Sequence, residues 1–131
     1  MIVTSFTNDG QAGAIVAFSV TSGGLLWPHD EEIVMLIGAG RLTFHLHGND
    51  TLKGKRQVSR SLITRLRQRF NLAVAEIDGI DEHRRLVVGL TCVSNEQHHA
   101  NEMIDQAIKF AYAQHLDAEL VEVRRDIIEG V

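Results

Sequence analysis

Apolar residues change their spacing along residues 34–127, and this change constrains the fold more than any other feature of the chain. Residues 34–46 read as a strand, in which Leu42, Phe44 and Leu46 alternate with Arg41, Thr43 and His45 and give it one apolar face. In residues 52–70 the spacing becomes helical, and the apolar stripe consists of Val58, Leu62, Ile63, Leu66 and Phe70. A strand followed by an amphipathic helix is therefore expected, with Asp50 or Thr51 as the N-cap of the helix.

Two further strands and a second helix follow. Residues 72–78 and 85–93 are rich in apolar and β-branched residues, and the short link between them predicts an antiparallel pair. Ser94 and Gln97 have the spacing of a capping box, which marks the start of a helix. This helix is expected to end near His115, and its apolar face consists of Ala100, Met103, Ile104, Ala107, Ile108 and Ala111.

The last predicted element is a strand at residues 117–127, where apolar and charged residues alternate again. The complete order is β-α-β-β-α-β. With right-handed crossovers, the simplest packing of this order is a four-stranded antiparallel sheet with both helices on one face. The predicted fold class is therefore α+β, in the ferredoxin-like arrangement.

Residues 1–34 differ from the rest of the chain because they contain no Lys or Arg. One interpretation is a hairpin made of Ala14–Val20 and Leu25–Trp27, joined by a Gly-containing turn. The other is that residues 1–34 form a disordered or non-native leader, with Met35 as the true start. In both cases residues 35–131 are expected to form the folded domain.

Length and composition are those of a soluble single-domain protein, with 131 residues, 44% hydrophobic and 23% charged. The single cysteine, Cys92, excludes an internal disulfide and a cysteine-based zinc site, which favours a reducing compartment. No basic segment precedes the apolar stretch at Ala12–Val20, and the polar residues after it end that stretch well short of the ~20 residues of a membrane span. We expect a cytoplasmic protein with no membrane partner.

Several motifs resemble a known family. Thr51–Arg56 (TLKGKR) is similar to the S-L-K-x-K-R opening of the first helix in the bacterial YlxP-like family, a domain of unknown function. Phe70–Glu76 resembles the F-N-x-x-V-A-E strand entry of that family, and Val88–Leu90 with Val93–Asn95 resembles its third strand and second helix start. The resemblance covers about residues 35–128. It implies a ferredoxin-like fold, a bacterial cytoplasmic protein and, from gene neighbourhood, an association with RNA or ribosomes.

The first predicted helix concentrates positive charge. Residues 51–70 contain seven Lys or Arg and no acid, whereas the whole chain has a net charge of −4. Helical spacing places the basic residues on both sides of the apolar stripe, so we expect them to leave the buried face intact. Guanidinium groups and helix N-terminal N–H groups both suit phosphate, whereas the alternative is a solvated helix face. The candidate site for nucleic acid or another anion consists of Lys53, Lys55, Arg56, Arg60 and Arg67.

Few other residues suggest a metal site, a catalytic role or a base-stacking surface. His45 and His47 share one face of the first strand and could chelate a metal, but no carboxylate or cysteine cluster completes a site, and the alternative is a polar strand end. Cys92 lies in an apolar strand and is expected to be buried. The exposed sides of the central strands lack the aromatic residues that stack bases in RRM domains, so nucleic-acid binding would address the backbone. We expect no metal, no cofactor and no catalytic residues.

The sheet face opposite the helices is expected to carry Ile37, Ala39, Val87 and Val93. A partly apolar open face tends to be covered, either by a second copy or by the N-terminal leader. The sequence therefore predicts a small binding protein associated with RNA or ribosomal particles through its basic helix flank. The alternative function is a protein–protein adaptor or homodimer that uses the open sheet face, and the third is an enzyme of unknown class.

Overall fold

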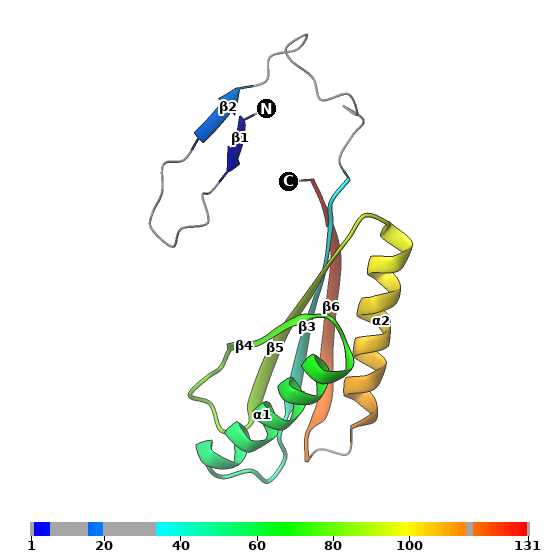
Figure 1. The fold of residues 1–131 in the computed structure, drawn as a ribbon. Helices are drawn as coiled ribbons and strands as arrows, with labels where there is room; N and C mark the ends of the chain where they lie inside the picture. Colours follow the sequence, from blue (N-terminus) through cyan, green and yellow to red (C-terminus); the bar gives the residue numbers. More distant parts are fainter. Residues whose placement is uncertain (1, 6–15, 20–33, 115–116, 131) are drawn as a thin grey trace. The chain divides into compact units, whose positions relative to one another are not determined.

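The computed structural model describes residues 2–5, 16–19, 34–114 and 117–130, which belong to two compact units (Figure 1). In the unit Met1–Ile33, β1 (Ile2–Ser5) pairs antiparallel with β2 (Val16–Ser19). β2 falls within the strand expected at residues 14–20, but its partner is β1, a segment for which no strand was predicted. The second strand of the expected hairpin, Leu25–Trp27, lies outside the described residues.

The unit Val34–Val131 has the predicted β-α-β-β-α-β order. Its elements are β3 (Leu36–His45), α1 (Leu52–Arg69), β4 (Ala73–Asp78), β5 (Arg85–Ser94), α2 (Gln97–Ala113) and β6 (Glu119–Glu129). The strands form one antiparallel sheet in the order β4-β5-β3-β6, and both helices cover the same face of it (Figure 1). The predicted ferredoxin-like α+β fold is confirmed.

The hydrophobic core lies between the sheet and the two helices. β3 is central, and its Leu42 is paired with Val88 of β5 on one side and Val123 of β6 on the other. Leu62 and Leu66 of α1 are fully buried against this face, and the rest of the predicted stripe is partly buried. The buried residues of α2 are four members of its predicted apolar face: Ala100, Ile104, Ala107 and Ala111.

Two glycines allow α2 to approach β3 closely. A Cβ atom on Gly38 would lie 2.8 Å from Cys92 Sγ and 3.0 Å from Ile104 Cγ1, and a Cβ atom on Gly40 would lie 2.9 Å from Leu90 Cδ1. All three distances are shorter than normal van der Waals contact. Glycine at these positions therefore makes room for the side chains that fill the core beneath α2.

The starts of the two helices differ from each other. Thr51 is the N-cap of α1, as predicted, and its hydroxyl accepts a hydrogen bond of 3.0 Å from the backbone N–H of Gly54. The predicted capping box of α2 is wrong: the N-cap is Glu96, and it makes no side-chain cap bond. Ser94 is still part of β5, where it pairs with Leu36, and its hydroxyl instead contacts the backbone of Glu96.

The last described turn of α2 ends at Ala113, and the helix end expected near His115 lies outside the described residues. Within the described ranges, neither α1 nor α2 has the length and apolar character that a membrane span requires.

Candidate functional site

One flank of α1 carries four exposed cationic side chains. We call Lys53, Arg56, Arg60 and Arg67 the basic flank. Their spacing of three, four and seven residues places them along one side of the helix, over a length of about 21 Å. Within the described residues, none of the first three has a hydrogen-bond or ion-pair partner, whereas Arg67 donates to the carbonyl of Val74 in β4 at 2.6 Å. The basic flank therefore lies on the β4 side of α1.

The opposite flank of α1 is occupied by contacts with α2 and its end. Arg65 donates a hydrogen bond of 2.7 Å to the side chain of Gln114, and the guanidinium of Arg69 lies 5.2 Å from the ring centroid of Phe110. These two arginines help to hold the helices together, so they differ from the residues of the basic flank in having partners within the fold.

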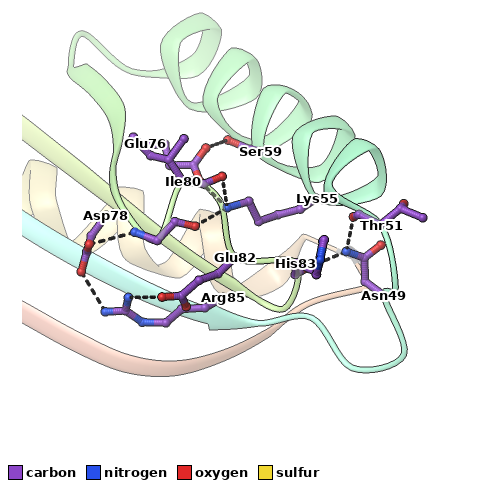
Figure 2. Close-up of polar contacts among 11 residues, drawn as sticks. Asn49, Thr51, Lys55, Ser59, Glu76, Asp78, Ile80, Glu82, His83 and Arg85 are labelled. Carbon is purple, nitrogen blue, oxygen red and sulfur yellow. Dashed lines mark hydrogen bonds and ion pairs between the residues drawn. The ribbon is translucent and has the colours of Figure 1, made fainter.

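Lys55 does not belong to the exposed surface. Its side chain is fully buried, and its ammonium group lies 2.9 Å from Glu76 Oε1 (Figure 2). It also donates to the carbonyl oxygens of Gly79 (2.5 Å) and Ile80 (2.9 Å), so the ammonium group contacts three partners within the protein. The expectation that the basic residues leave the buried face of α1 intact is wrong for Lys55, which is unavailable to an anion from solvent.

The buried ion pair joins three parts of the chain. Glu76 lies on the edge strand β4, and its second carboxylate oxygen accepts a hydrogen bond of 3.2 Å from the hydroxyl of Ser59 (Figure 2). Ser59 is also buried, one turn after Lys55 on the same face of α1. A sequence signal for this arrangement exists, because Lys55 and Ser59 precede Leu62 and Leu66 at steps of four, three and four residues. Position, rather than residue type, places Lys55 in the core.

The β4–β5 connection is shaped to receive Lys55. Gly79 has a φ of +63°, and its backbone N–H donates 2.8 Å to the carboxylate of Asp78 (Figure 2). Arg85 forms an ion pair with the same carboxylate at 3.0 Å. The Gly79 N–H and then the Arg85 guanidinium lower the pKa of Asp78, because both stabilise its ionised carboxylate. These bonds orient the Gly79 carbonyl towards the buried ammonium group.

Asn49 links the start of α1 to the β4–β5 connection. Its side-chain amide donates to the carbonyls of Thr51 (2.8 Å) and His83 (2.5 Å), as Figure 2 shows. Gly54 permits this position, because a Cβ atom there would collide with the Asn49 side-chain oxygen. Propensity alone would treat Gly54 as a weak point of the helix, but its missing side chain makes room for a bridge between two loops.

A hollow of about 520 Å³ lies between the β3–α1 connection, the side of α1 opposite the basic flank, and the start of β6. Its lining includes His47, Asp117 and Glu119, and His47 Nε2 lies 2.6 Å from a carboxylate oxygen of Glu119. The ring of His45 contacts that of His47 edge-on, with 4.2 Å between centroids. His47 is thus engaged with a carboxylate, and no group of three metal-ligating side chains converges in the described part of the chain.

The remaining candidates are placed as follows. Cys92 is buried, as predicted, and burial raises the pKa of its thiol. On the open sheet face, Ile37 lies between Val93 and Ile128 in one cross-strand row, and these two partners are 65% and 48% exposed. Val87 pairs with Thr43 on this face, as predicted, but its side chain is buried. β3 and β5 present no Phe, Tyr or Trp on this face, so an RRM-like stacking platform is excluded there.

The family of the chain follows from comparison with known proteins. The model of the family described as "Protein of unknown function (DUF503)" matches residues 37–125, which is more than half of the chain and extends from β3 into β6. The chain belongs to this family. No curated protein matches it significantly.

Proposed function

We propose that this DUF503 protein is a small non-enzymatic binding protein that holds RNA through the basic flank of α1. The observation that carries the proposal is the row formed by Lys53, Arg56 and Arg60, three exposed cations without an ionic partner in the described residues. An acid on the next turn would neutralise such cations and stabilise the helix, and residues 51–70 contain no acid.

The chemistry of the basic flank suits a phosphate backbone. Guanidinium groups donate paired hydrogen bonds in a plane that matches phosphate, and the basic flank, about 21 Å long from Lys53 to Arg67, can contact several successive phosphates. β3 and β5 carry no Phe, Tyr or Trp on the open sheet face, so base-specific recognition is not part of the proposal. The proposed mode is electrostatic and independent of sequence.

Lys55 has a supporting role in this proposal. Its ion pair with Glu76 and its bonds to the β4–β5 connection fix the first turns of α1 on the sheet. Lys53 and Arg56 flank it in the sequence, so the buried lysine anchors the segment that presents them. The proposed interface is therefore the predicted set of five residues without Lys55.

Finer assignments belong to the same proposal. The motifs at Thr51–Arg56 and Phe70–Glu76 support a YlxP-like assignment within the DUF503 family. This assignment supports a bacterial, cytoplasmic protein with ribosomal particles as the source of RNA, and the single cysteine agrees with a reducing compartment.

The test is binding of the full chain to bulk ribosomal RNA at 50 and 200 mM salt. The parent is expected to bind at low salt and to weaken steeply at high salt. The variant Arg56→Gln/Arg60→Gln should lose most of this binding. The matched control, Arg65→Gln/Arg69→Gln, removes the same charge from the opposite flank of α1 and should bind nearly as the parent does.

Circular dichroism and urea unfolding establish that both variants are folded. Equal loss of binding in the two variants would mean that only total charge matters, and absence of parent binding at 50 mM salt would refute the proposal.

A second candidate function, a protein–protein adaptor, has one observation in its favour. The apolar row Val93–Ile37–Ile128 crosses three strands of the open sheet face, and its outer members are among the most exposed large apolar side chains of the unit. Binding through this row should depend weakly on salt. Val93→Asp should abolish such binding and leave RNA binding unchanged, which pull-down experiments with the parent and the variant can measure.

A further inference from the structure

The two edges of the sheet are unequal. β4 has six residues, its register shifts at Ile77, and Arg67 occupies the carbonyl of Val74. β6 has eleven residues, its register with β3 shifts once, at Val121, and in the described residues it pairs only with β3. Both edges contain one irregularity, so the difference lies in length and in the occupied carbonyl: a short, occupied edge resists pairing with another chain, whereas a long free edge is a template for it. β6 is therefore the edge at which the sheet can be extended.

Apolar side chains gather along the free edge of β6. Val121 is 54% exposed, Val123 is 40% exposed, and Tyr112 of α2 is 74% exposed. A hollow of about 360 Å³ separates α2 from β6 at this place, and its apolar lining consists of Ile108, Tyr112, Leu120, Val121 and Val123. The hydrophobic layer between helices and sheet is thus left open on this side, as it is where a second protein surface completes a core.

Glu122 and Arg124 of β6 are complementary in charge to the same two residues of a second copy that runs antiparallel to it. If two copies of β6 pair antiparallel about a two-fold axis at Val123, Glu122 of each copy lies opposite Arg124 of the other, and Val123 lies opposite itself. Opposed residues of an antiparallel pair share a face, so both ion pairs form on the open sheet face and the valines meet beneath the helices. Within one chain Arg124 already donates to Glu122 at 2.7 Å, so pairing of two copies joins two such ion pairs into a network of alternating charges, which stabilises the pair.

Neighbouring registers are less favourable. An axis at Arg124 places this arginine opposite itself and Glu122 opposite Asp126, which are repulsive pairs. An axis at Arg125 opposes two arginines directly, although it places Arg124 opposite Asp126, and next to the axis it requires the N–H of Ile127, which the side chain of Asp126 already occupies at 2.8 Å. The register centred on Val123 also brings the two hollows at Leu120–Val123 together.

From these observations we propose that a second copy of this chain binds along the free edge of β6, in the antiparallel register centred on Val123. The resulting sheet has eight strands, with α2 of both copies beside the two-fold axis. α1 lies over the distant β4 edge, so each end of the sheet presents one basic flank. This dimer is distinct from one that uses the open sheet face, and it does not depend on RNA binding.

The first test uses charge reversal and sedimentation of the full chain. Glu122→Arg opposes arginines at both pairs and should weaken the dimer about tenfold or more. Glu122→Arg/Arg124→Glu restores opposite charges and should recover most of the affinity. Both side chains are solvent-accessible, so folding should be retained. A parent that stays monomeric at 100 μM, or a double variant as weak as the single variant, would overturn the proposal.

The second test reports the register. Val123→Cys places two thiols opposite each other at the axis, within the Cα separation that a disulfide requires. Under mild oxidation it should form a covalent dimer at least tenfold faster than Gln68→Cys, an exposed control on α1. Parent Cys92 is buried and should not cross-link. Equal rates for the two variants, or faster cross-linking of Arg125→Cys, would contradict the proposed register.

Discussion

The two helices of the folded unit perform the same structural task with different chemistry. α1 has eighteen residues and α2 has seventeen, and both cover the same face of the sheet with a row of buried side chains. α1 contains seven basic residues and no acid, whereas the charged residues of α2 are Glu102, Asp105 and Lys109. Because α2 covers the sheet without a cationic flank, the fold alone does not account for the exposed charge of α1.

The buried faces of the helices differ as well. The fully covered residues of α2 are apolar, whereas α1 buries Lys55 and Ser59 among its leucines. These polar residues contact Glu76 and the carbonyls of the β4–β5 connection, so α1 is held on the edge strand by directed bonds in addition to packing. Charge therefore has two uses on α1. The buried Lys55 fixes the position of the helix, and the exposed basic flank remains accessible to a binding partner.

The largest expected effect comes from removing the buried charge of α1. Lys55→Met leaves the Glu76 carboxylate without its ion-pair partner and two carbonyl groups without their donor. We expect the free energy of unfolding to fall by about 3–5 kcal/mol, measured by urea denaturation. Lys109→Met, on the exposed side of α2, is the matched control and should change it by less than about 0.5 kcal/mol.

The variant Lys55→Met/Glu76→Leu sharpens this prediction. It removes both charges, so it should be more stable than Lys55→Met alone, because no uncompensated carboxylate remains buried. A single variant as stable as the parent would show that the ion pair does not fix α1.

The next largest effect is expected at Gly54. Helix propensity alone predicts that Gly54→Ala stabilises α1 by about 1 kcal/mol. The added methyl group would collide with Asn49, whose amide bonds to Thr51 and His83 would be disturbed, so we expect a net loss of about 1–2 kcal/mol by urea denaturation. In the Asn49→Ala background the same substitution should cost less, and a stabilising effect in the parent would contradict the proposed role of Gly54.

The smallest effect concerns the helix caps. Thr51→Ala removes a hydroxyl that accepts a hydrogen bond from Gly54, and it should cost about 1 kcal/mol. Glu96→Ala, at the corresponding position of α2, removes no cap bond and should cost less than about 0.5 kcal/mol. Thermal and urea unfolding measure the two variants. An equal loss of unfolding free energy in both would show that the side-chain cap of α1 does not set it apart from α2.

Sequence reasoning identified the element order, the sheet with its two helices, and the buried faces of α1 and α2, because each depends on a repeated apolar spacing. It missed Lys55, since lysine is normally exposed and its buried partners lie on β4 and a connection far along the chain. The capping box at Ser94 failed for a related reason. Pairing of Ser94 with Leu36 extends β5, and long-range pairing of this kind is absent from a local motif.

Within the proposed site, the sequence placed Lys53, Arg56 and Arg60 correctly on one exposed helix flank, because their position depends only on helical geometry. It could not indicate that Arg67 also caps a carbonyl of β4, since this contact requires the packed edge strand. The sequence also did not indicate that β6 is a free edge, because strand order is a property of the whole sheet.

The most direct test of the central claim is the salt dependence of RNA binding in three forms of the full chain. The parent is compared with Lys53→Gln/Arg56→Gln/Arg60→Gln and with Arg65→Gln/Arg69→Gln/Lys109→Gln, which removes the same charge elsewhere. Each lost phosphate contact should reduce the slope of log K against log salt by about 0.7, so the first variant should show a slope shallower by about 2 and the second the slope of the parent. Equal slopes in the two variants would contradict a binding site on the basic flank.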